Sequence, residues 1–410
     1  MSVVKGISLK CAAKVKSVTM TLETFLLGLL TFWALLYLLG RIFHLDRYGL
    51  EIKPAYLTYK FKRFNERIES LTEKHPGFWR NFWSGGIVCA VGIMIYGIYW
   101  LFMNLYSFFY KPEVASPVLP FIPGVAFDLR WLPHILIALS ISAILHELAH
   151  GMAACADKIS LRSFGLFLIL FIFGAFTEPE EEEFKKARTL SKVRVYSAGP
   201  AVNLATAIPS FFLIANLSLF YLTISPFYAP SSGVLILGTY SSGPLEAAGL
   251  TPGDVIQSLN HTGVNDLFDF YEYLEEVKPN ETLILSVLYK NGTGNRITIK
   301  TIEHPKNKTL GFIGLSVAFH YYPPRLPVLP ASGPYHLYWF YWWSLMISLS
   351  LSMFNMLPIY PFDGGGFLKA LIESLAKSPR KILLVQYVTS GFFILLLGAN
   401  MALSILHFLI

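Results

Sequence analysis

His146, Glu147 and His150 form an HExxH motif, the pattern in this chain with the clearest chemical meaning. On a helix this spacing places two imidazoles one turn apart on one face, with a carboxylate beside them. Such a pair of histidines binds zinc, and the glutamate acts as the general base that activates water. The motif therefore predicts metal-assisted hydrolysis of a peptide bond, although the bare motif also arises by chance.

The motif lies inside an apolar run, residues 131–156, that is long enough to cross a bilayer. Ionisable residues at membrane depth are costly, so they mark functional sites more often than packing positions. We therefore expect the metal site to lie within the membrane.

A catalytic zinc ion needs a third protein ligand and one open position for water. Asp363 is the candidate, because it follows Pro358 and Pro361 and precedes three glycines at the end of another apolar run. The prolines end that helix, and the glycines allow close backbone approach. The sequence predicts that His146, His150 and Asp363 together bind Zn²⁺; an aspartate that only caps a helix is the alternative.

The elements that must position these residues are membrane spans. Of the 410 residues, 54% are hydrophobic and 14% are charged, whereas soluble proteins carry about a quarter charged residues. Six segments have the length and apolarity of spans: 22–43, 85–110, 131–156, 195–222, 335–357 and 382–410. The net charge of +7 then reflects basic loops at a membrane surface, and no nucleic-acid partner is expected.

The distribution of basic residues predicts how the chain crosses the membrane. The basic loop after the first span is expected in the cytoplasm. Alternating crossings then place both candidate metal-binding motifs near the cytoplasmic face and residues 226–334 outside. Four N-terminal lysines conflict with this orientation but are outnumbered: Lys5, Lys10, Lys14 and Lys16. The first apolar run lacks a clear cleavage site, so we expect a retained span rather than a signal peptide.

Two segments depart from the pattern of spans. Residues 161–176 are apolar but too short to cross a bilayer, and their composition predicts a re-entrant β-hairpin. Residues 233–304 are less apolar, with four strand-like stretches, a helical stretch at 267–277 and an Asn291-Gly292 turn. The expected fold class is therefore an all-α polytopic membrane bundle of about six helices, with a β-hairpin and an inserted α+β domain.

These residues resemble the site-2 proteases, the intramembrane zinc metalloproteases of peptidase family M50. The family pattern combines HExxH, Gly-Pro-x-x-Asn and NxxPxxPxDG in three spans; the last two are 199–203 and 355–364 here. The resemblance covers about residues 131–376. It implies zinc ligation by His146, His150 and Asp363, with Glu147 as general base and Asn355 as a donor to the oxyanion.

Asn203 has no settled role, because a contact at the active site and an interhelical hydrogen bond explain a polar residue in a span equally well. The inserted segment looks like a PDZ domain, which implies binding of a C-terminal peptide as an added strand. Its carboxylate would then lie on backbone amides of a turn such as 232–236. A blocked groove that acts as a size filter is equally compatible with the sequence.

The resemblance implies an endopeptidase that cuts the transmembrane segment of single-span membrane proteins. Its products would be released transcription regulators or cleared signal-peptide remnants. The chain is expected in the lipid bilayer as a multi-pass protein, of the plasma membrane in a prokaryote or an internal membrane in a eukaryote. The expected domains are 1–130 with the basic loop, 131–225 and 335–376 as the catalytic core, 231–304 as the PDZ-like insert, and 382–410 as a C-terminal span.

Three alternatives remain open from the sequence. A catalytically inactive scaffold would keep the fold, although the intact Glu147 argues against it. A different membrane metalloprotease would take its third ligand from the glutamates of residues 178–183. A transporter also uses intramembrane histidines and aspartates, but no inverted repeat is visible and a proton path does not need HExxH spacing.

Overall fold

The computed structural model describes residues 22–122, 125–376 and 378–408. The lysines at 5, 10, 14 and 16, which bear on the predicted orientation, lie outside these residues. The chain forms two compact units. One contains residues 20–212 and 340–410, which we call the membrane unit, and the other contains residues 213–339, which we call the insert unit.

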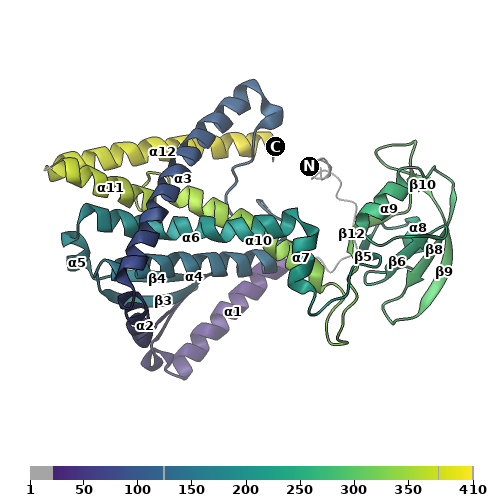
Figure 1. Cartoon of the computed structure of the whole chain (residues 1–410), viewed down its shortest axis with the longest axis horizontal. Coiled ribbons are helices and arrows are strands. Elements are labelled where there is room, and N and C mark those ends of the chain that lie inside the picture. Colours follow the sequence, from purple (N-terminus) through teal and green to yellow (C-terminus); the bar gives the residue numbers. More distant parts are fainter. Residues whose placement is uncertain (1–21, 123–124, 377, 409–410) are drawn as a thin grey trace. The chain divides into compact units, whose positions relative to one another are not determined.

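Within the described residues, five helices are long and apolar enough to cross a membrane. They are α1 (Leu22–Ile42), α3 (Pro76–Tyr110), α4 (Leu132–Ala156), α6 (Thr189–Ala215) and α12 (Pro379–Phe408) (Figure 1). They correspond to five of the predicted spans. A helix is the expected outcome for such runs, because it satisfies every backbone hydrogen bond internally where no water is available.

Two predicted spans differ in detail from the structure. The run 195–222 is divided, because Asn216 ends α6 and caps the short helix α7 (Leu217–Ile224), accepting a hydrogen bond from the Leu219 amide at 3.0 Å. The run 335–357 is helical, as α10 (Gly333–Asn355). It is not among the five apolar helices, since Tyr, Trp and His residues fill its first turns.

The predicted β-hairpin is present as β3 (Leu161–Ile169) and β4 (Ile172–Pro179), with Leu170 and Phe171 at its tip. It is larger than expected, because β1 (Leu50–Lys53) and β2 (Tyr56–Lys60) extend it to an antiparallel sheet of order β1-β2-β3-β4. The segment predicted as a basic loop therefore contains two strands and helix α2 (Lys62–Glu73). Strand β4 ends the sheet, so its outer edge has no strand partner among the described residues.

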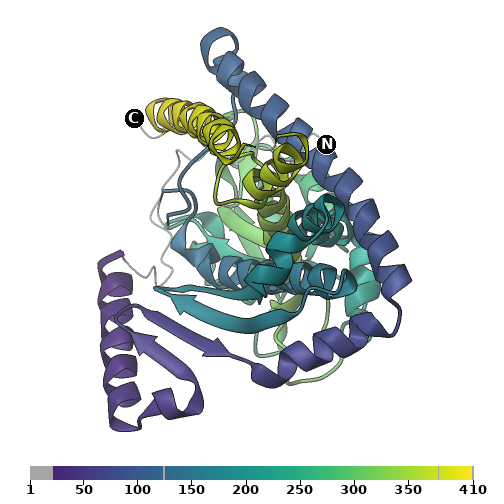
Figure 2. The same ribbon diagram turned by 90° about the vertical axis from the view of Figure 1, so that its left-hand side faces the viewer.

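Helices pack against both ends of the hairpin. At its tip, the Trp33 indole of α1 donates to the Leu170 carbonyl at 2.8 Å, and the rings of Phe25 and Phe171 lie 5.6 Å apart. At its other end, Gly151 of α4 lets the helix approach closely, since a Cβ there would lie 3.3 Å from the Thr177 side chain. Figure 2 shows the strands between α1 (purple) and the remaining helices. The hairpin thus runs along the helix that carries the HExxH motif.

Helices α4, α6 and α10 meet through small polar side chains. The hydroxyl groups of Ser142 and Ser348 lie 2.9 Å apart, Thr206 donates to Ser348 at 3.2 Å, and Ser352 donates to the Pro200 carbonyl at 2.7 Å. Such hydrogen bonds contribute only about 0.6 kcal/mol each in membrane proteins. Their main effect is therefore to fix the rotation of the three helices, which decides where each functional side chain points.

The insert unit contains the predicted α+β domain. Its main sheet has the order β12-β5-β6-β8-β9. The strands are β5 (Val234–Thr239), β6 (Val255–Leu259), β8 (Thr282–Leu288), β9 (Gly294–Lys300) and β12 (Leu315–His320), with β7 (Thr262–Gly263) attached to β6. Helices α8 (Pro244–Ala247) and α9 (Leu267–Leu274) and the short pair β10 (Ile302–Glu303) and β11 (Gly311–Phe312) complete it. Phe270, Leu283 and Leu285 are fully buried in its core.

The turn predicted to bind a peptide carboxylate, residues 232–236, cannot do so. Strand β5 is internal, paired with β12 on one side and β6 on the other. The amides of Ser232, Gly233 and Ile236 already donate to the carbonyls of Tyr321, Asn265 and Asp254. The prediction was wrong because the sequence of a turn before a strand does not show whether its amides are already bonded. Among the described residues, the edge strands of this sheet are β12 and β9.

Candidate metal and proteolytic site

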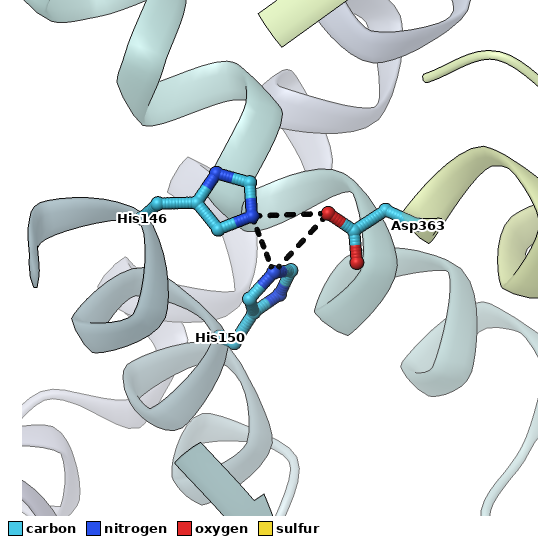
Figure 3. Close-up of side chains that lie close together, drawn as sticks. All are labelled: His146, His150 and Asp363. Atoms are coloured by element: carbon cyan, nitrogen blue, oxygen red, sulfur yellow. Dashed lines mark hydrogen bonds and ion pairs between the residues drawn. The ribbon is translucent and has the colours of Figure 1, made fainter. Parts of the chain in front are cut away.

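Helix α4 carries two histidines whose side chains lie next to an aspartate from a distant part of the sequence (Figure 3). His146 and His150 are 6% and 8% exposed, and their Nε2 atoms are 3.0 Å apart. The Oδ2 atom of Asp363 is 3.0 Å from His146 Nε2 and 3.3 Å from His150 Nε2. The structure therefore brings together the three residues that the sequence predicts as metal ligands, and in the described part of the chain they form a group that could hold a metal ion.

The spacing of these atoms fits a tetrahedral zinc ion. Zinc bonds to imidazole nitrogen and carboxylate oxygen are about 2.0–2.1 Å long, so tetrahedral ligand atoms lie about 3.3–3.4 Å apart. The three observed separations, 3.0, 3.0 and 3.3 Å, approach this value. Two imidazoles and one carboxylate also leave one tetrahedral position for water, as a catalytic site requires.

The ring of His150 is oriented by helix α6. Its Nδ1 lies 2.6 Å from the carbonyl oxygen of Val195. A carbonyl can only accept, so His150 donates from Nδ1 and keeps a lone pair on Nε2. A metal ligand needs this tautomer, and a backbone carbonyl is a common partner for the far nitrogen of such a histidine.

The ring of His146 is oriented by Asn203, also on α6. The side-chain amide of Asn203 is fully buried and lies 2.9 Å from His146 Nδ1. Its Oδ1 has no hydrogen-bond partner among the residues that the structure describes. Rotation of the amide by 180° exchanges its nitrogen and oxygen. The oxygen then accepts from Nδ1 and His146 keeps a lone pair on Nε2. The orphaned oxygen is therefore accounted for if His146 binds a metal.

Helix α6 contributes Gly199 to the site, in addition to the Val195 carbonyl and Asn203. A Cβ at this position would lie 2.5 Å from His146 Nε2 and 2.6 Å from His150 Nε2, closer than atoms can pack. Any side chain here would therefore occupy the space beside the two nitrogens. This close approach explains physically why glycine begins the Gly-Pro-x-x-Asn segment.

Asp363 reaches the histidines because the chain turns sharply after α10. Helix α11 (Asp363–Leu375) begins at Asp363 itself. A Cβ on Gly364 would overlap the Met356 carbonyl oxygen, and one on Gly365 would lie 2.6 Å from the Ile359 carbonyl oxygen. The glycines thus allow the start of α11 to pack on the preceding turn, as the sequence predicted, and this packing directs Asp363 toward α4.

Glu147 does not belong to the group of ligands. Its Oε2 accepts a hydrogen bond of 2.9 Å from the backbone amide of Thr177 on β4. The Thr177 hydroxyl donates at 2.6 Å to the carbonyl of Glu147 itself. The carboxylate predicted to act as general base is therefore hydrogen-bonded to β4, the last strand of the sheet.

Asn355 lies near the same nitrogen of His146, Nε2, that Asp363 contacts. Its side-chain nitrogen is 3.4 Å from His146 Nε2, at the long end of hydrogen-bonding distance. The two asparagines thus differ in position, because Asn203 contacts the far nitrogen of the ring and Asn355 the near one. The sequence left Asn203 open, and its place behind the ring favours orientation of His146 over contact with substrate.

The glutamates of residues 178–183 lie apart from the histidines. Glu178 is bonded to Ser163 and Lys60, and Glu183 to the Ser160 amide. Glu181 and Glu182 pair with Lys185 along the short helix α5 (Glu181–Lys186). None of them joins the group His146–His150–Asp363 within the described residues. The geometry therefore gives no support to a metal site with a glutamate as third ligand.

Sequence reasoning missed two partners of the site, the Val195 carbonyl and the Thr177 amide. Both act through backbone atoms, which every residue type carries, so no residue letter marks them. The only signal for Thr177 was its position directly after the predicted hairpin, residues 161–176.

Comparison with known proteins agrees with this geometry. The chain matches the sequence profile of Peptidase family M50 over residues 134–399. An uncharacterized protein of Methanocaldococcus jannaschii is 27% identical over 88% of this chain and 89% of its own length. A membrane-bound transcription factor site-2 protease homolog of Arabidopsis thaliana is 25% identical over 54% of this chain and 43% of its own length.

Two solved structures are similar to part of the chain. They are PDZ domains of SdrC-like proteins from Listeria monocytogenes and Listeria innocua, 20% and 22% identical. The matches cover 21% and 22% of this chain and 86% and 96% of those chains, each with a TM-score of 0.19.

Proposed function

The chain belongs to peptidase family M50, and from that premise we propose that it is a zinc-dependent endopeptidase that cuts transmembrane segments within the membrane. The observation that carries the proposal is the meeting of His146 and His150 with Asp363. Helix α4, which carries the two histidines and Glu147, is apolar enough to cross a bilayer. A soluble HExxH protease has no reason to place these residues in such a helix.

Each residue has a distinct part in the proposed reaction. His146, His150 and Asp363 hold the zinc ion. Bound there, zinc supplies Lewis acidity, which lowers the pKa of water and polarises the substrate carbonyl. Glu147 takes the proton from the attacking water and later passes it to the leaving amine nitrogen. The amide of Asn355 donates to the carbonyl oxygen as that oxygen gains negative charge.

The substrate must expose its backbone before it can be cut, because a helix keeps its amides in its own hydrogen-bond ladder. Strand β4 ends its sheet next to α4, and an edge strand can accept an unwound segment as an added strand. A proline in β4 should therefore reduce cleavage while zinc stays bound. Unchanged cleavage would leave the hairpin with a packing role only.

The proposed substrates are single-span membrane proteins in the lipid bilayer that surrounds the membrane unit. The name of the Arabidopsis relative, a membrane-bound transcription factor site-2 protease homolog, makes a membrane-tethered transcription regulator one candidate class. The insert unit, outside the membrane in this proposal, binds a C-terminal peptide or restricts access by size. A peptide would add to β12 or β9, the two edge strands of its sheet in the described part of the chain.

The experiment that tests this function compares the purified protein with its Glu147→Ala variant. Both are supplied with zinc and a single-span substrate in detergent. Cleavage by the wild type alone supports the proposal with Glu147 as base. Equal cleavage by both variants would indicate a contaminating protease. If neither cleaves any of a panel of single-span substrates while both hold zinc, the chain is a metal-binding scaffold instead.

A further inference from the structure

Strand β4 contacts the general base directly, through one residue. Thr177 makes two hydrogen bonds to Glu147, one from its backbone amide to the carboxylate and one from its hydroxyl to the main-chain carbonyl. No hydrogen bond joins the other carboxylate oxygen, Oε1, to a described residue. The amide therefore fixes one oxygen of Glu147 and leaves the second available to a water molecule.

The register of the hairpin shows which other groups of β4 face the same way. In an antiparallel strand, amide and carbonyl groups point alternately toward the partner strand and away from it. Thr177 pairs with Phe164 of β3, yet its amide points away from β3 to Glu147. The backbone groups of Ala175 and Phe173, two and four residues earlier, therefore also point away from β3.

The outer edge of β4 thus has two kinds of amide. Those of Ala175 and Phe173 are oriented to pair with an added strand, whereas that of Thr177 is already bonded to Glu147. A strand that paired with Thr177 as well would have to take this donor from the base. Pairing at Ala175 and Phe173 alone would leave the bond intact and bring the next part of the segment to Glu147.

We propose that Thr177 is a positioning residue, whose backbone amide orients Glu147 at the point where substrate pairing with β4 ends. This inference rests on the proposed function and adds how the base is aligned with the bound segment. One strand then holds the substrate, through Ala175 and Phe173, and sets the direction of the base that acts on it. The distance between substrate and base is fixed by the two-residue repeat of the strand.

Proline substitution can separate the two roles of β4, which are to pair with the substrate and to orient Glu147. Proline removes the backbone amide at one position and is tolerated on an edge strand. Thr177→Pro removes the amide and the hydroxyl, whereas Thr177→Val removes the hydroxyl and keeps the amide. Ala175→Pro removes an outward amide that does not contact Glu147. All three are compared with the wild type in detergent, with zinc and a single-span substrate, for kcat, KM and zinc content.

General base catalysis contributes about 10²–10⁴-fold, so misdirecting Glu147 should lower kcat by at least about tenfold. We expect this loss in Thr177→Pro relative to Thr177→Val, with KM within about threefold and zinc retained. Ala175→Pro should instead raise KM and leave kcat within about threefold of the wild type. Equal kcat in Thr177→Pro and Thr177→Val, or a loss confined to KM, would overturn the inference.

A second measurement does not depend on activity or on the folding of the proline variant. Hydrogen exchange at the Thr177 amide is measured by fragmentation mass spectrometry in the full-length wild type and in Glu147→Ala. Loss of its acceptor should speed exchange at Thr177 by at least about tenfold and leave the Phe176 amide, in the hairpin ladder, unchanged. Unchanged exchange at Thr177 would overturn the inference. A wild type that cleaves nothing would refute the proposed function instead, which this readout does not touch.

Discussion

Nε2 of His146 and Oδ2 of Asp363 lie 3.0 Å apart, although 217 residues separate the two in the sequence. This approach depends on glycines in two places. Gly199 of α6 lies against the histidine rings, and Gly364 and Gly365, in the first turn of α11, lie against the backbone that precedes this helix. Two motifs that are each ambiguous alone therefore become one donor set.

Replacement of Asp363 by alanine should remove most of the bound zinc. Two histidines alone hold zinc far more weakly than three ligands do, and the variant should retain less than about a tenth of the metal after dialysis. Metal content per purified protein is measured by plasma mass spectrometry. Glu182→Gln is the matched control, since Glu182 is bonded to lysines of its own helix, and its zinc content should equal that of the wild type. Full zinc content in Asp363→Ala together with zinc loss in Glu182→Gln would point to a glutamate as third ligand.

Replacement of Gly199 by alanine should also abolish zinc binding, through sterics rather than loss of a donor. The added methyl group would lie 2.5–2.6 Å from the two histidine nitrogens. The control is Gly92→Ala in α3, where a Cβ meets nothing within 4 Å. We expect zinc loss in Gly199→Ala alone, while Gly92→Ala keeps the zinc content and the thermal unfolding of the wild type. Full zinc content in Gly199→Ala would contradict the described packing.

Replacement of Asn203 should weaken zinc binding, whereas replacement of Asn355 should lower kcat. Asn203→Ala removes the partner behind the His146 ring, so zinc affinity should fall by about 10–100-fold. Asn355→Ala leaves that partner in place, so zinc content should be retained while kcat falls by about 10²–10³-fold. Zinc affinity is measured by competition with a chelator, and kcat is measured from initial rates at saturating zinc. Equal loss of zinc in both variants would assign Asn355 to the support of the metal instead.

Most of the membrane unit could be predicted from the sequence, because the signals there are strong. Long apolar runs give α1, α3, α4, α6 and α12, and the spacing of His146 and His150 specifies one helix face. Asp363 could be identified because Pro358 and Pro361 end α10 before the glycines. These features depend on residue type and interval, which a sequence displays directly.

Other features could not be predicted, for physical reasons. Strands β1 and β2 lie in a segment whose basic residues suggested a loop. They form because β2 pairs with β3 and β1 pairs with β2. The turn at 232–236 was misassigned because the sequence does not show that β5 has a strand on each side. The contacts of Val195 and Thr177 use backbone atoms, so their place in space, and not their residue type, gives them a role.

The insert unit should lose stability as the pH falls, because of His320. Burial lowers the pKa of His320 below its ordinary value of 6.5, and the carboxylate of Asp266 offsets this only in part. The unfolded chain therefore binds a proton at higher pH than the folded one, so stability is complete above about pH 6.5 and declines below it. Hydrogen exchange in β5 and β12 of the full-length protein measures the effect. The His320→Gln variant should show a weaker pH dependence; an identical decline in the variant would assign the effect to other groups.

We expect the peptide bond to be cut within the membrane at the His146–His150–Asp363 site, with Glu147 as the base. The most direct measurement places the purified protein and a single-span substrate in lipid vesicles and locates the cut by intact-mass spectrometry of both products. Wild type should cut inside the apolar span, and Glu147→Ala and Asp363→Ala should leave the substrate whole. A cut found only in the polar flanks of the span, or an active Asp363→Ala protein, would contradict the account.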